Sequence, residues 1–178
     1  MNCPACKKGP LESSEHVELP KTLLCPYCQG QWIQASRYWS WVEQHGANLP
    51  EKPAPEQVWQ PIDSHRILLC PECGALMMRF KVGHGVGFSI DHCSACGGIW
   101  FDRNELEALK DRNLHDDIHF IFSQAWQHQV QSQQNNALYQ KRMEQLLGAE
   151  DFLEAKRIKG WLSQHPKRSI IQAYLTNK

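Results

Sequence analysis

The stretch Cys93-Ser94-Ala95-Cys96-Gly97-Gly98-Ile99-Trp100 decides the fold. Two cysteines separated by two residues form a tight turn from which both sulfurs reach one metal ion. The same spacing occurs three more times, so all eight cysteines of the chain fall into four pairs. The pairs are Cys3/Cys6, Cys25/Cys28, Cys70/Cys73 and Cys93/Cys96. Two pairs complete a tetrahedron of thiolates, and the sequence therefore predicts two structural zinc ions.

The two sets of four cysteines indicate an internal duplication. Eighteen residues separate the two pairs of the first set, and nineteen separate the pairs of the second. In each set a tryptophan, Trp32 or Trp100, follows the last cysteine by four residues, and Gly30 stands at the position of Gly98. Tyr38 and Trp41 align with Leu106 and Leu109. Such a repeat predicts two structural copies, and we expect each tryptophan to pack against the cysteine turns of its own copy.

A β-hairpin and a helix are expected around the second set. Apolar and polar residues alternate from Met78 to Val82 and from Phe88 to Asp91, with a glycine-rich turn between the two runs. After Trp100 a short helix is expected, with Asp102 as its N-cap and Glu105 completing a capping box. A hairpin that carries two cysteine turns and leads into a helix is a zinc ribbon.

The boundaries follow from these patterns. We expect a first ribbon at residues 1–43, a proline-rich linker at 44–64, a second ribbon at 65–112 and a helical module at 113–178. The linker is expected to keep the ribbons apart without fixing them rigidly. The predicted fold class is therefore a small zinc-stabilised α+β protein, with two tandem zinc ribbons followed by a C-terminal α-helical module.

The second ribbon resembles a known family. Its ending, Cys-x-x-Cys-Gly-Gly-x-Trp-x-Asp-x-x-Glu-Leu from Cys93 to Leu106, resembles the bacterial transcription-factor zinc-finger family, whose ribbons are likened to that of transcription factor IIB. The resemblance implies a ribbon fold, with zinc at Cys70, Cys73, Cys93 and Cys96. Residues 1–43 look like a degenerate copy that keeps the cysteines and Trp32 but lacks the Asp-Arg-Asn-Glu-Leu ending. The resemblance implies little about function.

Other chemistries fit the eight cysteines less well than structural zinc does. A site with four thiolates has no open position for water or substrate, so it predicts a structural ion and no enzyme. Iron also accepts four thiolates, and colour in the purified protein would indicate it. A dithiol redox enzyme is less consistent, because every pair has a partner pair at ribbon distance. His84 and His92 flank a site that is already complete, and no set of catalytic residues is evident.

Charge and hydropathy restrict the partners. The chain has 19 basic and 19 acidic residues, no apolar run of the length that spans a membrane, and no signal segment at Met1. We therefore expect a soluble cytoplasmic protein. A basic surplus occurs only from Asp151 onward, with six basic residues against two acidic. Its clustered members are Lys156, Arg157, Lys159, Lys167 and Arg168.

These observations favour an adaptor or regulator that acts through protein contacts. Trp39, Trp41 and Trp59 lie where the core is expected to be thin, and tryptophan is over-represented at interface hot spots. The alternative is a factor associated with nucleic acid or RNA polymerase that uses the basic C-terminal helices. The partner is expected to be a protein, and no small-molecule substrate is evident. A role in transcription regulation belongs to the alternative.

Overall fold

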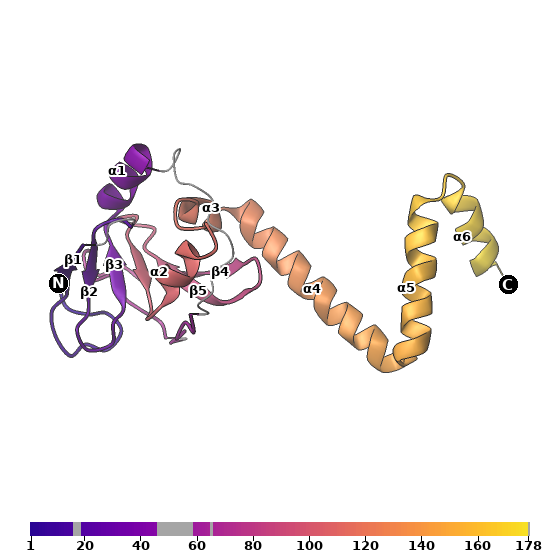
Figure 1. Cartoon of the computed structure of the whole chain (residues 1–178), viewed down its shortest axis with the longest axis horizontal. Helices are drawn as coiled ribbons and strands as arrows, with labels where there is room; N and C mark the ends of the chain where they lie inside the picture. The colour runs from indigo at the N-terminus through magenta and orange to yellow at the C-terminus, as the bar shows by residue number, and fades with distance from the viewer. Residues whose placement is uncertain (16–18, 46–58, 65, 178) are drawn as a thin grey trace. The chain divides into compact units, whose positions relative to one another are not determined.

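The computed structural model of the chain describes residues 1–15, 19–45, 59–64 and 66–177. The chain divides into two compact units, Met1–Val130 and Gln131–Lys178, and the boundary lies within one long helix. The first unit contains a β-sheet and the eight cysteines, and the second is helical (Figure 1). This arrangement confirms the predicted α+β fold. Among the described residues, none of the helices combines the length and apolarity needed to cross a membrane.

One antiparallel sheet runs through both ribbons. Its six strands lie in the order β1-β2-β3-β6-β5-β4. They are β1 (Glu12–Ser14), β2 (Thr22–Leu24), β3 (Gln31–Ile33), β4 (Met78–Gly83), β5 (Val86–His92) and β6 (Ile99–Phe101). The first ribbon supplies β1 to β3 and the second supplies β4 to β6. Because β3 pairs with β6, the sheet is continuous from one ribbon to the other.

The proline-rich linker had led us to expect that the two ribbons are held apart. The structure shows instead that they share one sheet. The central linker residues 46–58 lie outside the described residues. The end of the linker that is described lies on the second ribbon. There the N–H of Ile62 donates to the carbonyl of Arg103 at 3.1 Å, and the side-chain amide of Asn104 donates to the carbonyl of Gln60 at 3.1 Å. The β3–β6 hydrogen bonds fix the relative position of the ribbons more firmly than a tether does.

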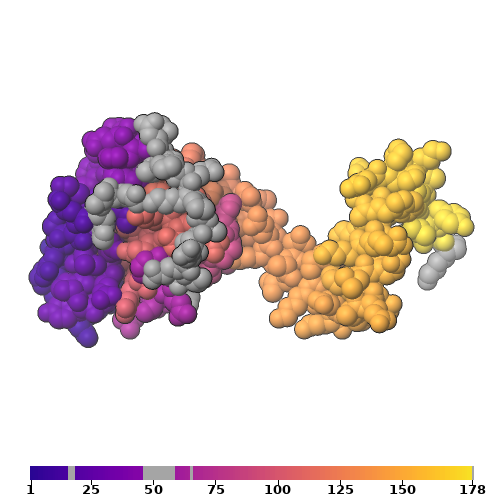
Figure 2. Space-filling view, viewed as in Figure 1, coloured from indigo at the N-terminus to yellow at the C-terminus, as the bar shows by residue number. Residues whose placement is uncertain are grey.

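Two tryptophans and two glycines make the junction between the ribbons. Trp32 on β3 stands directly opposite Trp100 on β6, and both are fully buried. A Cβ atom placed on Gly98 would lie 2.1 Å from Cζ2 of Trp32, and one placed on Gly30 would lie 2.2 Å from Cζ2 of Trp100. Each indole thus covers the glycine of the other ribbon, and both indoles also belong to one core cluster with the cysteines of both ribbons, as the sequence led us to expect for the cysteines of their own copy. Because each glycine lies against the indole of the other ribbon, neither position has room for a side chain. Figure 2 shows the two ribbons in direct contact.

The predicted hairpin of the second ribbon is confirmed. β4 and β5 pair antiparallel, with Phe80 opposite Ile90 and a register shift between Lys81 and Gly83 next to the turn. The turn is formed by His84 and Gly85, which both have positive φ, at 50° and 79°. Two such residues in succession are typical of the tight turns that match the twist of a hairpin. Val82, Phe88 and Ile90 lie in the apolar core below the sheet.

Four helices begin in the first unit. They are α1 (Ala35–His45), α2 (Glu105–Lys110), α3 (Ile118–Ile121) and α4 (Gln124–Leu147). Tyr38 of α1 and Leu106 of α2, which the repeat aligned, are both buried in the core. The start of α4 covers the outer edge of β4. Gln127 accepts from the N–H of Lys81 at 3.2 Å and donates to its carbonyl at 2.8 Å, and the indole of Trp126 donates to the carbonyl of Val82 at 2.8 Å.

The second unit contains the rest of α4, with α5 (Ala149–Gln164) and α6 (Arg168–Thr176). The polar stretch from Gln131 to Asn136 is continuous helix. Gly148, with a φ of 82°, separates α4 from α5, as its position in the sequence predicted. None of the residues 131–177 is buried. This unit therefore has no apolar core of its own.

Candidate metal centres

The eight cysteines form two closed clusters of four, one in each ribbon. The first comprises Cys3, Cys6, Cys25 and Cys28, and the second comprises Cys70, Cys73, Cys93 and Cys96. Within each cluster all four sulfurs lie within 4.8 Å of one another, and the closest pairs are 3.6 Å apart in the first and 3.5 Å in the second. Sulfurs bound tetrahedrally to zinc at about 2.3 Å stand about 3.8 Å apart. The donor set and its spacing fit one structural zinc ion in each ribbon, as predicted.

All four cysteine turns share one backbone geometry. In each turn the N–H of the residue after the second cysteine donates to the carbonyl of the first cysteine. These donors are Lys7, Gln29, Gly74 and Gly97, at 3.2, 2.9, 3.0 and 2.7 Å. All four have positive φ, between 57° and 76°. The second ribbon places glycine at both positions, where the left-handed conformation has no steric cost, and the first ribbon does not.

The backbone N–H groups of the turns point at the sulfurs. In the first ribbon, the N–H of Cys6 donates to Sγ of Cys3 at 3.4 Å. In the second, the N–H groups of Glu72 and Cys73 donate to Sγ of Cys70, both at 3.4 Å. Hydrogen bonds donated to a thiolate stabilise its charge, and the thiolate is the form that binds metal.

Burial and the crowding of the sulfurs separate the pKa values within each cluster. Burial raises the pKa of Cys25, but N–H groups from Cys28 and Tyr27 outweigh it and lower the pKa to about 7. At Cys28, burial and the neighbouring sulfurs raise the pKa. Cys93 and Cys96 repeat this pair of shifts. Four thiolates this close together need a divalent cation beside them, and zinc is the ion that this ligand set fits.

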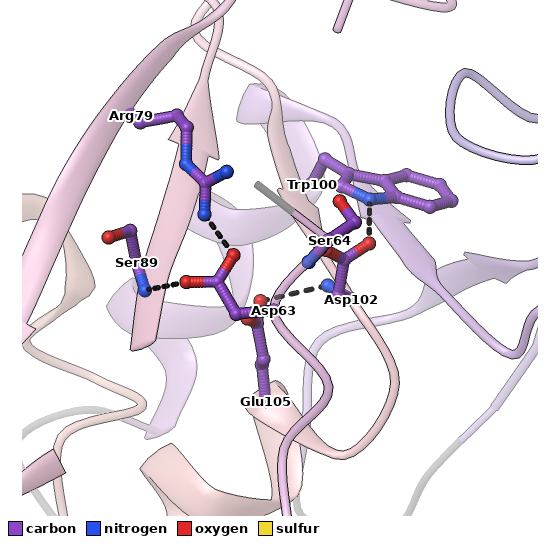
Figure 3. A network of polar contacts seen from close by, with 7 residues as sticks. All are labelled: Asp63, Ser64, Arg79, Ser89, Trp100, Asp102 and Glu105. Carbon is purple, nitrogen blue, oxygen red and sulfur yellow. Dashed lines mark hydrogen bonds and ion pairs between the residues drawn. The ribbon is translucent and has the colours of Figure 1, made fainter. Parts of the chain in front are cut away.

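A polar network surrounds Trp100 in the second ribbon (Figure 3). The indole N–H of Trp100 donates to Oδ1 of Asp102 at 3.0 Å, and the N–H of Ser64 donates to Oδ2 at 2.8 Å. The N–H of Asp102 donates to Oε2 of Glu105 at 2.8 Å. The bond from Asp102 N–H to Glu105 is the half of the expected capping box that the structure contains. Asp102 is not the N-cap, because the indole and Ser64 occupy its carboxylate. The helix begins at Glu105 instead, after Asn104 in a left-handed conformation.

The segment before the second ribbon supplies a residue that sequence reasoning did not identify. Asp63 forms an ion pair with Arg79 of β4, and its Oδ2 accepts from the N–H of Ser89 on β5 at 3.2 Å. One oxygen of Asp63 also lies within 4.8 Å of the Asp102 and Glu105 carboxylates. Asp63 lies in a stretch whose prolines and polar residues indicated only a linker.

The histidines next to the second cluster contact aromatic rings. His92 stacks on Phe122 with a distance of 4.1 Å between the ring centroids, and the His84 and Trp126 ring centroids are 4.5 Å apart.

The three tryptophans proposed as interface residues differ in exposure. Trp41 is buried and Trp59 is half-buried against the core, whereas Trp39 is exposed.

The five clustered basic residues that the sequence singled out lie on α5 and around the start of α6. Lys156, Arg157 and Lys159 are on α5, Lys167 precedes α6 and Arg168 begins it. Arg157 forms an ion pair with Glu154 at 2.6 Å, and Nζ of Lys159 lies 5.9 Å from the ring centroid of Tyr139.

Residues 69–112 match the model of a family described as "Transcription factor zinc-finger". The match contains all four cysteines of the second cluster, so the second ribbon is similar to the zinc ribbons of this family. The first cluster lies outside the matched residues, which agrees with a degenerate first copy. Comparison with curated proteins and with solved structures gave no match.

Proposed function

We propose that the chain is a non-enzymatic adaptor, in which the double zinc ribbon carries a helical unit that binds a protein partner. One observation carries this proposal: residues 131–177 contain no buried residue, yet ten of their large apolar side chains are exposed. These are Leu138, Tyr139, Leu146, Leu147, Leu153, Ile158, Trp161, Ile170, Tyr174 and Leu175. Helices in proteins gain most of their stability from packing an apolar face, and exposed apolar patches mark interaction sites.

A groove between α4 and α5 is the part of this unit best suited to a partner. Its volume is about 590 Å³, and its apolar lining includes Tyr139, Met143 and Phe152. Lys156 and Lys159 also line it. An amphipathic helix with acidic residues beside its apolar face would fill such a groove and pair with the two lysines. The second unit as a whole has eight basic residues against four acidic, which favours an acidic partner.

The metal centres support a structural role for the ribbons. Each cluster supplies four thiolates, and a zinc ion so bound has no open position at which water or a substrate could be activated. In this proposal the zinc ions hold the double ribbon together and the helices make the contacts. We propose no catalytic residue and no small-molecule substrate.

Nucleic acid is the second candidate, and the basic surplus of α5 and α6 favours it. Phosphate binding needs positive charge gathered on one face. Arg157 already pairs with Glu154, and Lys156 and Lys159 line the groove next to apolar residues. This mixture of lysine and apolar lining suits an acidic helix better than a phosphate backbone.

Introducing a charge into the groove should abolish partner binding. We expect Phe152→Asp to reduce the recovery of a protein partner in a pull-down from native lysate roughly tenfold or more, because hot-spot aromatic residues contribute about 2 kcal/mol or more. The matched control is Gln145→Asp, which adds the same charge on exposed α4 outside the groove lining. Equal recovery with both variants would rule the groove out.

The same pull-down separates the two candidate functions. A protein partner should persist at equal stoichiometry after nuclease treatment and should tolerate moderate salt. Binding to nucleic acid should instead be lost on nuclease treatment and fall steeply with salt. That second result, together with loss of binding in the variant Lys156→Glu/Arg157→Glu/Lys159→Glu, would replace the adaptor proposal by the nucleic-acid one.

A further inference from the structure

Three carboxylates of the second ribbon and of the segment before it lie close together (Figure 3). Asp63, Asp102 and Glu105 each place one oxygen within 4.8 Å of the other two. A Ca²⁺ ion binds carboxylate oxygens at about 2.4 Å, so two oxygens on opposite sides of one ion stand about 4.8 Å apart. Three oxygens within this limit are close enough to bind one divalent cation together.

Buried oxygens in this cluster lack hydrogen-bond partners. Glu105 is only 1% exposed, and its Oε1 has no partner, while Oε2 accepts from the backbone of Asp102. Figure 3 places the Glu105 carboxylate beside Asp63. Asp91, a neighbour of the cluster and not a member of it, is 2% exposed and also leaves Oδ1 without a partner. A buried carboxylate oxygen without a partner is energetically costly, so the cluster has unused acceptor capacity.

The charges of the cluster and its neighbour Asp91 are not balanced. Asp63, Asp91, Asp102 and Glu105 supply four carboxyl groups, and the guanidinium of Arg79 faces Asp63 and Asp91. Burial raises the pKa of Glu105 to about 10, and the neighbouring carboxylates add to that effect. A bound cation would lower the pKa of Glu105 and relieve the repulsion.

We propose that Asp63, Asp102 and Glu105 bind one Ca²⁺-like divalent cation, at a third site separate from the two zinc centres. Carboxylate oxygens are hard ligands that select Ca²⁺, whereas the thiolate clusters select zinc, so the two kinds of site do not compete for one metal. Asp63 precedes the second ribbon in the chain, and the other two ligands follow β6. The ion would therefore fasten the end of the linker to the start of α2.

Terbium luminescence tests this site on the full-length, zinc-loaded protein. Tb³⁺ takes carboxylate ligands like those of Ca²⁺, and it emits when a nearby indole transfers its excitation. The indole of Trp100 donates to Asp102 at 3.0 Å and is therefore well placed to sensitise the ion. We expect sensitised emission that Ca²⁺ displaces, and a loss of affinity of about tenfold or more in Asp63→Asn and in Glu105→Gln, because each removes one charged ligand. Glu12→Gln, which neutralises an exposed carboxylate on β1, should leave the emission unchanged.

A second measurement needs no variant. A cation that binds only the folded protein raises its thermal unfolding midpoint, so saturating Ca²⁺ should raise the midpoint of the unaltered zinc-loaded chain. An unchanged midpoint would overturn the proposal. So would the absence of sensitised emission, or emission that is equal in the unaltered chain and in Asp63→Asn with its zinc content intact. The buried carboxyl groups would then be neutralised by protons.

Discussion

Gly98→Ala should lower the free energy of unfolding of the zinc-loaded protein by about 3 kcal/mol, the upper part of the range for overpacked cores. The added methyl group would lie 2.1 Å from Cζ2 of Trp32, a ring that is fully buried. Trp32 cannot move aside without disturbing its pairing with Trp100 across the β3–β6 junction. Gly30→Ala should have a similar effect through the ring of Trp100, at 2.2 Å. Chemical denaturation followed by tryptophan fluorescence measures both changes.

Gly87→Ala is the matched control. Gly87 also lies in a strand of the second ribbon, but a Cβ atom there would meet no heavy atom within 4 Å. Alanine in a strand loses less conformational entropy on folding than glycine, so this variant should be neutral or slightly more stable, by up to about 1 kcal/mol. If Gly98→Ala and Gly87→Ala were equally stable, the contact between the indole and the glycine would not hold the ribbons together.

Removing one zinc ligand should weaken both ribbons. Cys93→Ser should unfold the second ribbon, because zinc contributes on the order of 10 kcal/mol to the folding of small cysteine-based domains. Since β6 is the sheet partner of β3, the first ribbon would then lose one side of its sheet and the cover over Gly30. We therefore expect the first site to bind zinc more weakly as well, with less than one ion retained per chain at limiting zinc.

Native mass spectrometry and circular dichroism test this expectation, and Cys25→Ser is the matched variant because Cys25 aligns with Cys93. Each variant should lose zinc at both sites and lose sheet structure. If each variant kept one tightly bound zinc ion and its unsubstituted ribbon kept its structure, the two ribbons would fold independently. Unchanged zinc content in Cys93→Ser would contradict a role for that sulfur altogether.

The parts of this fold that depend on local chemistry were predictable from the sequence. A tight turn between two cysteines is fixed by a few residues, and the spacing from Cys70 to Cys96 admits only a short hairpin. The alternation from Met78 to Asp91 predicted that hairpin correctly. Both tetracysteine clusters and the C-terminal helices follow from patterns of the same kind.

The union of the two ribbons could not be predicted in the same way. Pairing between β3 and β6 joins residues far apart in the chain, and no local pattern encodes which edges meet. A signal was nevertheless present, because both copies place a glycine two residues before the tryptophan at Gly30 and Gly98. The repeat revealed that the positions are equivalent, but only the structure shows that each glycine is covered by the indole of the other copy.

The carboxylate cluster was hidden for a different reason. Asp102 and Glu105 carried the pattern of a helix start, and this local interpretation accounted for both. The pattern did not reveal that the indole of Trp100 takes the Asp102 carboxylate. Asp63 completes the cluster from a segment with no recognisable motif, and only its contacts with Arg79 and Ser89 distinguish it.

The first ribbon holds two residues in a left-handed conformation that glycine adopts more readily. Lys7 and Gln29 hold φ angles of 57° and 61°, where the second ribbon has glycine. This conformation costs an ordinary residue about 1–2 kcal/mol. A ribbon of that size standing alone has little stability to lose, but this one shares a sheet with an intact neighbour. The shared sheet therefore lets the first ribbon tolerate two backbone conformations that glycine would adopt at no steric cost.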